Sequence, residues 1–333
     1  MKVKGLRVLV TGGAGFIGSH LVDLLASQAN SIIVLDNFTS GKRENLNSHL
    51  NTKNVTVIEG DVRDKKLLID ITKDIDIVYH LAVQCLRVSI KDPELNHEVN
   101  ATGTLNLCIA CLENKVKRLV YVSSSEAYGT AVNVPMDENH PLNPITVYGA
   151  SKAAGEMYAL AYYKTYGLEG MVVRPFNTYG PRSHFEGAYG EVIPKFVLRY
   201  LCDASPVIFG DGMQTRDFTY VTDAVKGILM ASECDNMVGQ AVNIARGHEV
   251  SVSRLADIIS KKLGKKDINP VYEAARPGDV LRHYAGVIKA RDMFGYTASI
   301  DIESGIEQYI GWFKAQGYDY EGLLKQDKVF NWE

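Results

Sequence analysis

A tyrosine and a lysine with complementary acid–base chemistry, Tyr148 and Lys152, stand four residues apart in the chain. Residues at this spacing share one face of a helix. A free phenol has a pKa of about 10 and is a weak base at neutral pH, but a nearby ammonium favours the phenolate. Ser124, in a run of three serines, could position a substrate hydroxyl beside them. Together these residues predict removal of a proton from an alcohol.

A glycine-rich loop near the start of the chain could hold a dinucleotide. Gly12, Gly15 and Gly18, with Phe16 and Ile17 among them, lie between a β-like run and a helical run. Glycine lets the backbone turn tightly and approach a pyrophosphate, and the helix N-terminus adds free N–H groups. The loop therefore predicts a dinucleotide-binding site.

Acidic residues after the next strands would complete that site. Asp36, followed by Asn37, ends the second β-like run, where a carboxylate can bond the adenosine ribose and repel a 2′-phosphate. Asp61 and Val62 follow the third run, where an adenine edge could lie. NAD is therefore predicted over NADP. Its positively charged nicotinamide would also favour a phenolate base, and Lys152 could hold its ribose.

The elements that must position these residues alternate between apolar β-like runs and helical patterns. Strands are predicted over residues 6–10, 31–36, 55–59, 75–80, 118–123 and 168–174, and helices over 16–26, 96–113 and 147–166. Apolar strands separated by helices are typical of a parallel sheet covered on both faces. The first half is predicted to be α/β, a doubly wound parallel sheet of Rossmann type.

The pattern loosens after Pro175, where Gly, Pro and aromatic residues become dense up to Gly212. Loops over a cleft are predicted there, rather than a second regular core. Later helices are expected within 219–234, over 251–263 and around Ile306 to Phe313. The polar segment 325–333 is expected to be loosely held.

Composition limits the partners of the chain. The 333 residues are 46% hydrophobic with a net charge of −3, and no basic stripe suggests nucleic acid or a membrane surface. Without a secretory signal or a long apolar run, a cytoplasmic location is expected. The five scattered cysteines do not form a disulfide pattern, and Cys108 and Cys111 are expected to be buried helix thiols rather than a metal or redox pair. No metal site is predicted.

These motifs resemble the extended short-chain dehydrogenase/reductase family, specifically its nucleotide-sugar epimerases and dehydratases. The resemblance covers nearly the whole chain and rests on segments 11–18, 80–82, 100–104, 123–129, 148–152, 174–182, 216–218 and 276–279. It implies Ser124 and Tyr148 as the catalytic pair, Lys152 in support, and Leu81 and Ala82 beside NAD. It also implies a homodimer, for which the apolar faces of helices 96–113 and 147–166 would be suited.

The implied substrate is a nucleotide-sugar, whose diphosphate would meet Asn177, Arg216 and Arg276. Isolated arginines in Gly- and Pro-rich loops also suit bidentate capture of phosphate, with Arg282 a competitor for Arg276. The remaining predicted substrate-binding residues are Arg87 and Tyr189. The resulting division is an NAD-binding Rossmann domain, 1–175 and 217–246, and a smaller C-terminal nucleotide-sugar-binding domain, 176–216 and 247–333.

The fate of a 4-keto sugar distinguishes the reactions that the resemblance implies. Return of hydride to the other face gives a 4-epimerase, whereas loss of the C5 proton and the C6 hydroxyl gives a 4,6-dehydratase. Glu126 could be the C5 base of a dehydratase, but Ser125 stands where many dehydratases have an Asp that protonates the leaving hydroxyl. Some GDP-sugar dehydratases nevertheless resemble this Ser-Glu arrangement.

The motifs divide between these two reactions. Segments 80–104 and 276–280 resemble UDP-hexose 4-epimerases, whereas 125–142 resembles a UDP-sugar 4,6-dehydratase. The prediction is an NAD-dependent 4-epimerase acting on a UDP-hexose or UDP-N-acetylhexosamine. The 4,6-dehydratase is the alternative. A UDP-glucuronate decarboxylase and a non-catalytic NAD-binding protein are less favoured.

Overall fold

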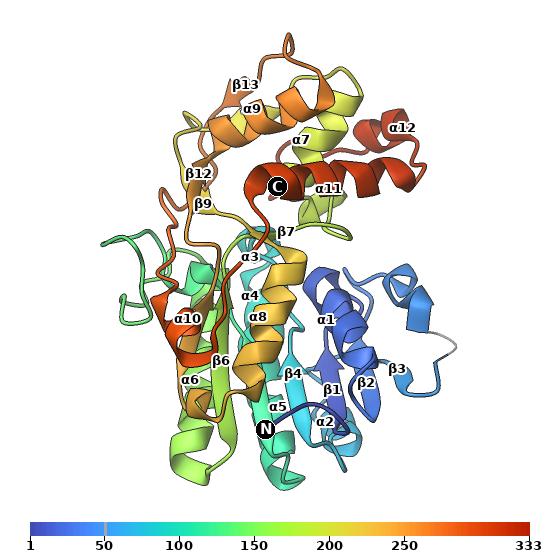
Figure 1. Ribbon diagram of the computed structural model, residues 1–333, viewed down its shortest axis with the longest axis vertical. Coiled ribbons are helices and arrows are strands. Elements are labelled where there is room, and N and C mark those ends of the chain that lie inside the picture. Colours follow the sequence, from blue (N-terminus) through green and yellow to red (C-terminus); the bar gives the residue numbers. More distant parts are fainter. Residues whose placement is uncertain (50–51) are drawn as a thin grey trace.

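The computed structural model describes residues 1–49 and 52–333 and contains a seven-stranded sheet in its lower part (Figure 1). All neighbouring strands pair in parallel, in the order β11-β6-β5-β4-β1-β2-β3. The strands are β1 (Arg7–Thr11), β2 (Ser31–Asp36), β3 (Val55–Glu59), β4 (Ile77–His80), β5 (Arg118–Val122), β6 (Glu169–Pro175) and β11 (Ala241–Ile244). Strand order reverses between β1 and β4, where ligands of doubly wound sheets bind. The predicted fold class is confirmed.

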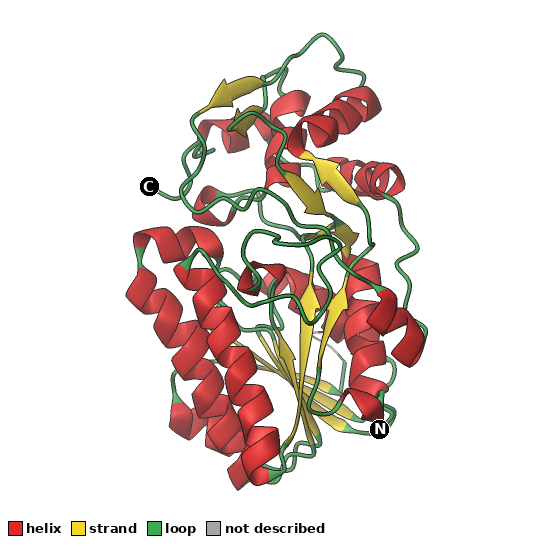
Figure 2. Cartoon of the chain, turned by 90° about the vertical axis from the view of Figure 1, so that its left-hand side faces the viewer, coloured by secondary structure: helices red, strands yellow, loops and turns green. Residues whose placement is uncertain are grey.

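Helices cover both faces of this sheet, each over its own hydrophobic core (Figure 2). One face packs against α1 (Phe16–Ala26), α8 (Val221–Glu233) and α10 (Ile288–Phe294). The other packs against α2 (Lys65–Ile71), α5 (Gly103–Glu113) and α6 (Val147–Tyr166). Cys108 and Cys111 are free thiols buried in the second core, as expected.

The helix predicted over residues 96–113 is interrupted, so that expectation was wrong. The structure has α3 (Leu86–Lys91), α4 (Pro93–His97), a π-helical turn over Glu98–Thr102, and then α5. Within that turn, Asn100 accepts a hydrogen bond from the Gln84 backbone N–H at 2.8 Å and donates to Ser151 Oγ at 3.0 Å. The interruption lets a buried amide tie the cleft-lining strand end to α6, and such turns are common at functional sites.

The upper part of the molecule has a regular core of its own. One of its helices, residues 192–201, lies where only loops were predicted, whereas the helices expected over 251–263 and around Ile306 to Phe313 are present. Its helices are α7 (Val192–Leu201), α9 (Val252–Leu263), α11 (Ile302–Ala315) and α12 (Tyr320–Lys325). Three two-stranded ladders accompany them: β7 (Thr178–Tyr179) with β10 (Thr219–Tyr220), β8 (Val207–Phe209) with β13 (Val271–Glu273), and β9 (Thr215–Asp217) with β12 (Glu249–Ser251). Phe196, Leu255 and Phe313 from three of these helices share one core.

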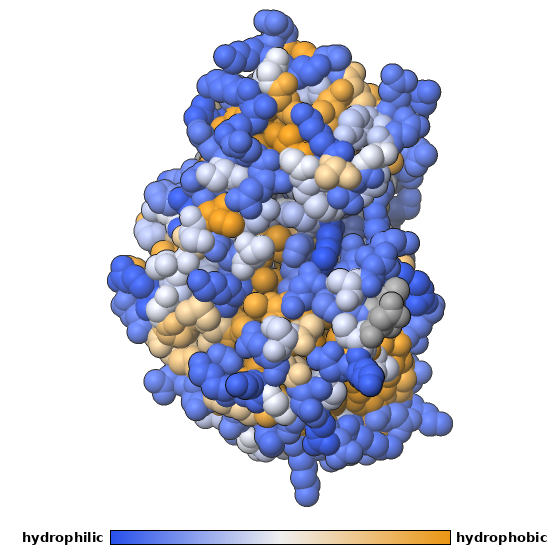
Figure 3. Space-filling view, turned by 45° about the vertical axis from the view of Figure 1, so that its right-hand side comes forward, coloured by the Kyte–Doolittle hydropathy of each residue, from blue (hydrophilic) through white to orange (hydrophobic). Residues whose placement is uncertain are grey.

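Segment 326–333 is held against the upper part, so the expectation of a loose tail was also wrong. Asn331 Nδ2 donates to the Gly190 carbonyl at 2.9 Å, and the Trp332 side chain is buried beside Phe209. Figure 3 shows a surface that is mostly hydrophilic, with apolar patches on both the upper and lower parts. Among the described residues, no helix has the length and apolar character needed to cross a bilayer.

Candidate active site

A cleft of about 480 Å³ lies between the carboxyl ends of the sheet strands and the upper core. Every predicted site residue lines it. The set comprises Gly12, Gly15, Phe16, Ile17, Gly18, Asp36, Asn37, Asp61, Val62, Leu81, Ala82, Arg87, Ser124, Glu126, Tyr148, Lys152, Asn177, Tyr189, Arg216 and Arg276. Residues far apart in the sequence are thus brought to the switch point of the sheet, where doubly wound folds bind their ligands.

The glycine loop packs so closely against neighbouring backbone that Gly12 and Gly18 cannot carry side chains without a shift. A Cβ on Gly12 would lie 2.6 Å from the Ala82 nitrogen, and its φ of +69° disfavours other residues. A Cβ on Gly18 would lie 2.1 Å from the Gly12 oxygen. The N-cap of α1, Gly15, offers no side-chain hydrogen bond, so the first-turn N–H groups are left for an anion.

Backbone hydrogen bonds hold Asp36 at the end of β2. Its carboxylate accepts from the N–H of Ala14 and of Phe38, both at 2.9 Å, while burial raises its pKa. Asn37 donates to Asp61 at 3.0 Å, which links the ends of β2 and β3. The three side chains form a polar edge where the ribose and adenine of a dinucleotide would lie, as the sequence predicts.

The base candidates Tyr148 and Lys152 lie in the first turns of α6, one turn apart. Thr146 caps this helix by accepting the Gly149 N–H at 3.0 Å, which fixes where Tyr148 enters the cleft. Lys152 Nζ donates to the Val122 carbonyl at 2.7 Å, and burial lowers the pKa of Lys152 to about 7. The ammonium is therefore held by β5 rather than by the phenol.

Burial raises the pKa of Tyr148, and a hydrogen bond with Ser124 only partly offsets that effect. The sequence argument relied on a nearby ammonium together with a positive nicotinamide, and the Lys152 ammonium is not among the groups that lower the pKa of Tyr148. The pKa is raised because desolvation penalises an anion in a closed cleft more than a single hydroxyl stabilises it. Deprotonation of Tyr148 consequently requires additional positive charge beside the ring when the site is in use.

One carboxylate holds two arginines side by side further along the cleft. Asp279 accepts Arg216 Nη2 at 2.8 Å and Arg276 Nη2 at 2.6 Å. Neighbouring guanidinium groups with donors to spare suit a diphosphate. Asn177 Nδ2 is buried without a hydrogen-bond partner in the described structure. Arg282 instead pairs with Glu249 outside the cleft lining, which removes the competitor to Arg276.

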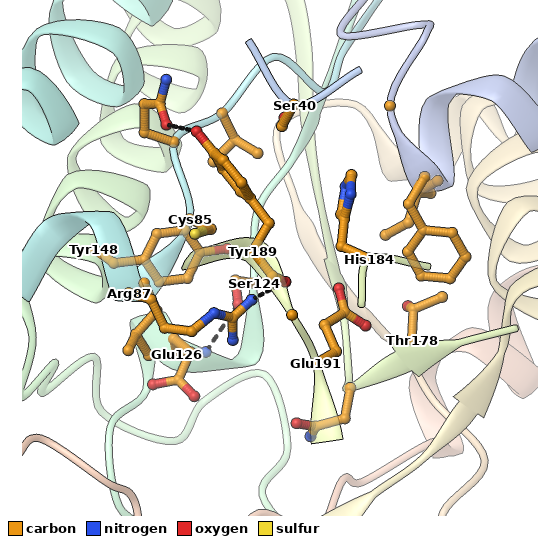
Figure 4. Close-up of a pocket in the computed structure, with 18 of the residues that line it drawn as sticks. Ser40, Cys85, Arg87, Ser124, Glu126, Tyr148, Thr178, His184, Tyr189 and Glu191 are labelled. Carbon is orange, nitrogen blue, oxygen red and sulfur yellow. Dashed lines mark hydrogen bonds between the residues drawn. The ribbon is translucent and has the colours of Figure 1, made fainter. Parts of the chain in front are cut away.

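Charged side chains crowd the end of the cleft nearest Tyr148 (Figure 4). Arg87 donates to the carbonyls of Ala188 and Tyr189, both at 2.7 Å, and so holds the loop that carries the Tyr189 ring. Among the residues that the structure describes, Glu126 Oε2 is buried and has no hydrogen-bond partner. Burial raises the pKa of Glu126, while Arg216 and Arg276 lower it.

Sequence reasoning missed a second acid in this part of the cleft, Glu191. It lies across the gap from Arg87 and Ser124 in Figure 4 and precedes α7. Burial raises the pKa of Glu191 to about 7, and the charge of Arg87 lowers it. The only available signal was an acidic residue directly after the aromatic loop, which an N-terminal helix position would equally explain.

Comparisons with known proteins identify the family of the chain. The model of the NAD dependent epimerase/dehydratase family matches residues 8–245. A Methanocaldococcus jannaschii protein with a provisional assignment as a UDP-glucose 4-epimerase is 40% identical over 310 residues, covering 92% of this chain and 98% of that protein.

Two solved structures are similar over nearly the whole chain. A UDP-N-acetylglucosamine 4-epimerase from Methanobrevibacter ruminantium M1, in complex with UDP-N-acetylmuramic acid, has a TM-score of 0.88 at 38% identity and covers 94% of this chain and 99% of its own. A dTDP-glucose 4,6-dehydratase from Streptomyces venezuelae, with NAD bound, has a TM-score of 0.89 at 32% identity and covers 93% and 97%. The chain belongs to the NAD-dependent epimerase/dehydratase family and is an NAD-dependent enzyme of that family.

Proposed function

We propose that this enzyme is a 4-epimerase of UDP-sugars, acting on a UDP-hexose or UDP-N-acetylhexosamine. The similarity to 4-epimerases over more than nine-tenths of the chain supports this activity. The paired arginines support a diphosphate-linked substrate. We further propose that the parts 1–175 with 217–246 hold NAD and that 176–216 with 247–333 hold the nucleotide-sugar.

The side chains support the following steps. Ser124 positions the C4 hydroxyl of the sugar, and Tyr148 takes its proton. NAD, when bound, would supply hydride transfer at C4 and the positive charge that the buried phenol needs. Tyr148 then returns the proton to the C4 oxygen, which becomes the new hydroxyl. Lys152, whose Nζ donates to the Val122 carbonyl, would hold the ribose of the cofactor.

The surroundings of Ser125 are the observation that favours epimerisation over dehydration. A 4,6-dehydratase must protonate the departing C6 hydroxyl while a base removes the C5 proton. Ser125 Oγ lies 3.4 Å from His283 Nδ1, and burial lowers the pKa of that histidine to about 3. Neither group is an acid at neutral pH. Glu126 thus has a neutral hydroxyl beside it where a dehydratase would use an acid.

A second reaction remains favoured by one feature, the buried unpaired Glu126, which is suited to a C5 base. Proton NMR of the purified protein with UDP-glucose, UDP-N-acetylglucosamine, UDP-glucuronic acid and GDP-mannose, without added NAD, distinguishes the two. We expect a gluco/galacto mixture, reached from either side, with a neutral UDP-sugar. A new C6 methyl signal beside a 4-keto group would instead identify a 4,6-dehydratase and contradict the proposal.

We also propose a homodimer formed through α5 and α6. Both helices carry apolar side chains on the surface of the single chain, with Leu112 36% exposed and Met157 47% exposed. Exposed large apolar residues on adjacent helices are typical of a surface that another chain covers.

A further inference from the structure

Segment 326–333 returns from α12 to the cleft and forms part of its wall. Val329, Asn331 and Trp332 line the same cavity as Tyr148. In Figure 2 the C-terminus lies beside the region between the upper and lower parts of the molecule. Trp332 is 9% exposed and Asn331 is 6% exposed, although the segment belongs to no helix or strand. Contacts with the cleft wall, rather than membership of a helix or strand, therefore keep these side chains buried.

Two cations of α7 hold the beginning of this segment. The Asp327 carboxylate lies 2.8 Å from Arg199 Nη2 and 3.0 Å from Lys195 Nζ, and its side chain is only 2% exposed. Lys195 also donates to the carbonyl of Lys328. A buried carboxylate shared by two cations is costly to separate from them. The segment is therefore fixed to the helix whose first turn carries the cleft-lining Val192.

A second contact holds the end of the segment against the loop that carries Tyr189. Asn331 Nδ2 donates to the carbonyl of Gly190, the residue between Tyr189 and Glu191. Because both anchors are buried, the intervening residues have little freedom to leave the cleft. The two anchors together set the position of the Trp332 ring.

Aromatic rings gather where the segment meets β8. The Trp332 and Phe209 ring centroids are 4.7 Å apart at an interplanar angle of 76°, and Phe330 packs edge-on against Trp332 at 5.6 Å. Val207 and Val252 line the cleft beside them. Val207, Phe209 and Trp332 give this part of the cleft an apolar and aromatic side, while the nearby cations Lys195 and Arg199 are paired with Asp327. Such a surface suits a planar heterocycle.

The order of groups along the cleft indicates which part of a ligand would reach these rings. The sugar must lie at Tyr148, and its diphosphate at Arg216 and Arg276. Phe209 ends β8, only a short turn before β9, which carries Arg216. Since the diphosphate joins sugar to nucleoside, the nucleoside must lie beyond the arginines.

We infer that Trp332 and the segment that carries it form one wall of the nucleobase subsite, with Phe209 as its neighbour. This inference rests on the proposed nucleotide-sugar function. It assigns the base of a nucleoside diphosphate, stacked or packed on the indole, as the occupant of this apolar and aromatic side. Segment 326–333 is accordingly a part of the binding site, and binding of the base depends on its two anchors.

Calorimetric titration of the NAD-loaded protein with UDP and with inorganic pyrophosphate tests the assignment. We expect Trp332→Ala, and a chain ending at Gln326, to bind UDP about tenfold or more weakly, which corresponds to loss of one aromatic contact with a base. Pyrophosphate binding should stay within about threefold, because it does not reach the rings. Tyr272→Ala, an aromatic deletion at an exposed position of β13, is the matched control and should leave both affinities unchanged.

Tryptophan fluorescence gives a readout that a purely structural role would not move. The chain has two tryptophans, Trp312 and Trp332. In a Trp312→Phe variant, UDP should change the emission of Trp332, whereas pyrophosphate should not.

The possible results separate this assignment from the function on which it rests. Unchanged UDP affinity in Trp332→Ala overturns the assignment alone. Tighter binding also overturns it, because the segment would then compete with the base. A wild-type protein that binds pyrophosphate but shows no preference for UDP overturns both the assignment and the proposed substrate class.

Discussion

Among the individual residues, Tyr148 is proposed to transfer the proton, although burial opposes its ionisation. Removing its hydroxyl should abolish proton transfer without changing the cleft shape. We expect Tyr148→Phe to lower kcat by about 10³-fold while NAD stays bound, since general acid–base catalysis contributes factors of this order. Rates from NMR and the NAD content of the purified protein would check this. Tyr166→Phe, on the same helix but 58% exposed, should keep full activity.

Glu191 should make the stability of the protein depend on pH. Its folded pKa of about 7 is raised above that of an ordinary carboxyl, so its contribution to stability is present at low pH and is lost as pH rises towards 7. Glu191→Gln removes the free-energy cost of ionising this buried carboxyl at high pH. We expect the variant to gain roughly 2 kcal/mol in unfolding free energy at pH 8 and little at pH 4.5.

Urea unfolding at the two pH values measures this gain. Glu113→Gln, at an exposed position of α5, serves as the control and should show no pH-dependent gain. An equal effect of both substitutions would show that the environment of Glu191 is not the cause.

At the scale of elements, NAD binding should depend on close packing between the β1–α1 loop and the first turn of α1. A methyl group on Gly18 would lie 2.1 Å from the Gly12 oxygen, so α1 would have to move away from the loop. We expect Gly18→Ala to weaken NAD binding by at least about tenfold and to lower the Tm. Gly311→Ala, in the middle of α11 with no atom within 4 Å of the added carbon, should be neutral or stabilising. Bound NAD and thermal unfolding distinguish the two.

Elements with strong patterns and caps could be predicted closely from the sequence. The helix over 147–166 has its polar cap at Thr146 and a left-handed Gly167 after its end, and both boundaries agree with the structure. By contrast, α7 was missed because Pro194 lies inside it and Gly- and aromatic-rich loops precede it. The break before α5 depends on hydrogen bonds of Asn100 to distant residues, which local patterning does not show.

The site divides in the same way. Residues in short motifs, such as the loop glycines and Tyr148 with Lys152, could be predicted because spacing alone positions them. Glu191 and Trp332 could not, because only the packing of the upper core against the sheet turns them towards the cleft. Site residues that lie within one motif can be predicted from the sequence. Residues that line a cleft between two cores cannot, because their positions depend on how the cores pack.

At the scale of the whole molecule, the proposed dimer predicts a change of mass on mutation. Met157→Glu places a charge in the centre of the apolar surface of α6 and should shift the protein from dimer to monomer in light scattering after size exclusion. Leu281→Glu changes a residue that is 70% exposed and lies outside α5 and α6, so it should leave the mass unchanged. A wild-type protein of monomer mass would contradict the proposal.

The upper core is assembled from separate stretches of the chain, with α8 between them packed on the sheet. One group of its buried side chains comes from residues 179–220, and the other group comes from residues 252–313. A single gene crossover within residues 221–251 would therefore separate the two stretches and pack side chains of two different proteins against each other. Intact transfer of this core to a relative by recombination would require both stretches to be exchanged together.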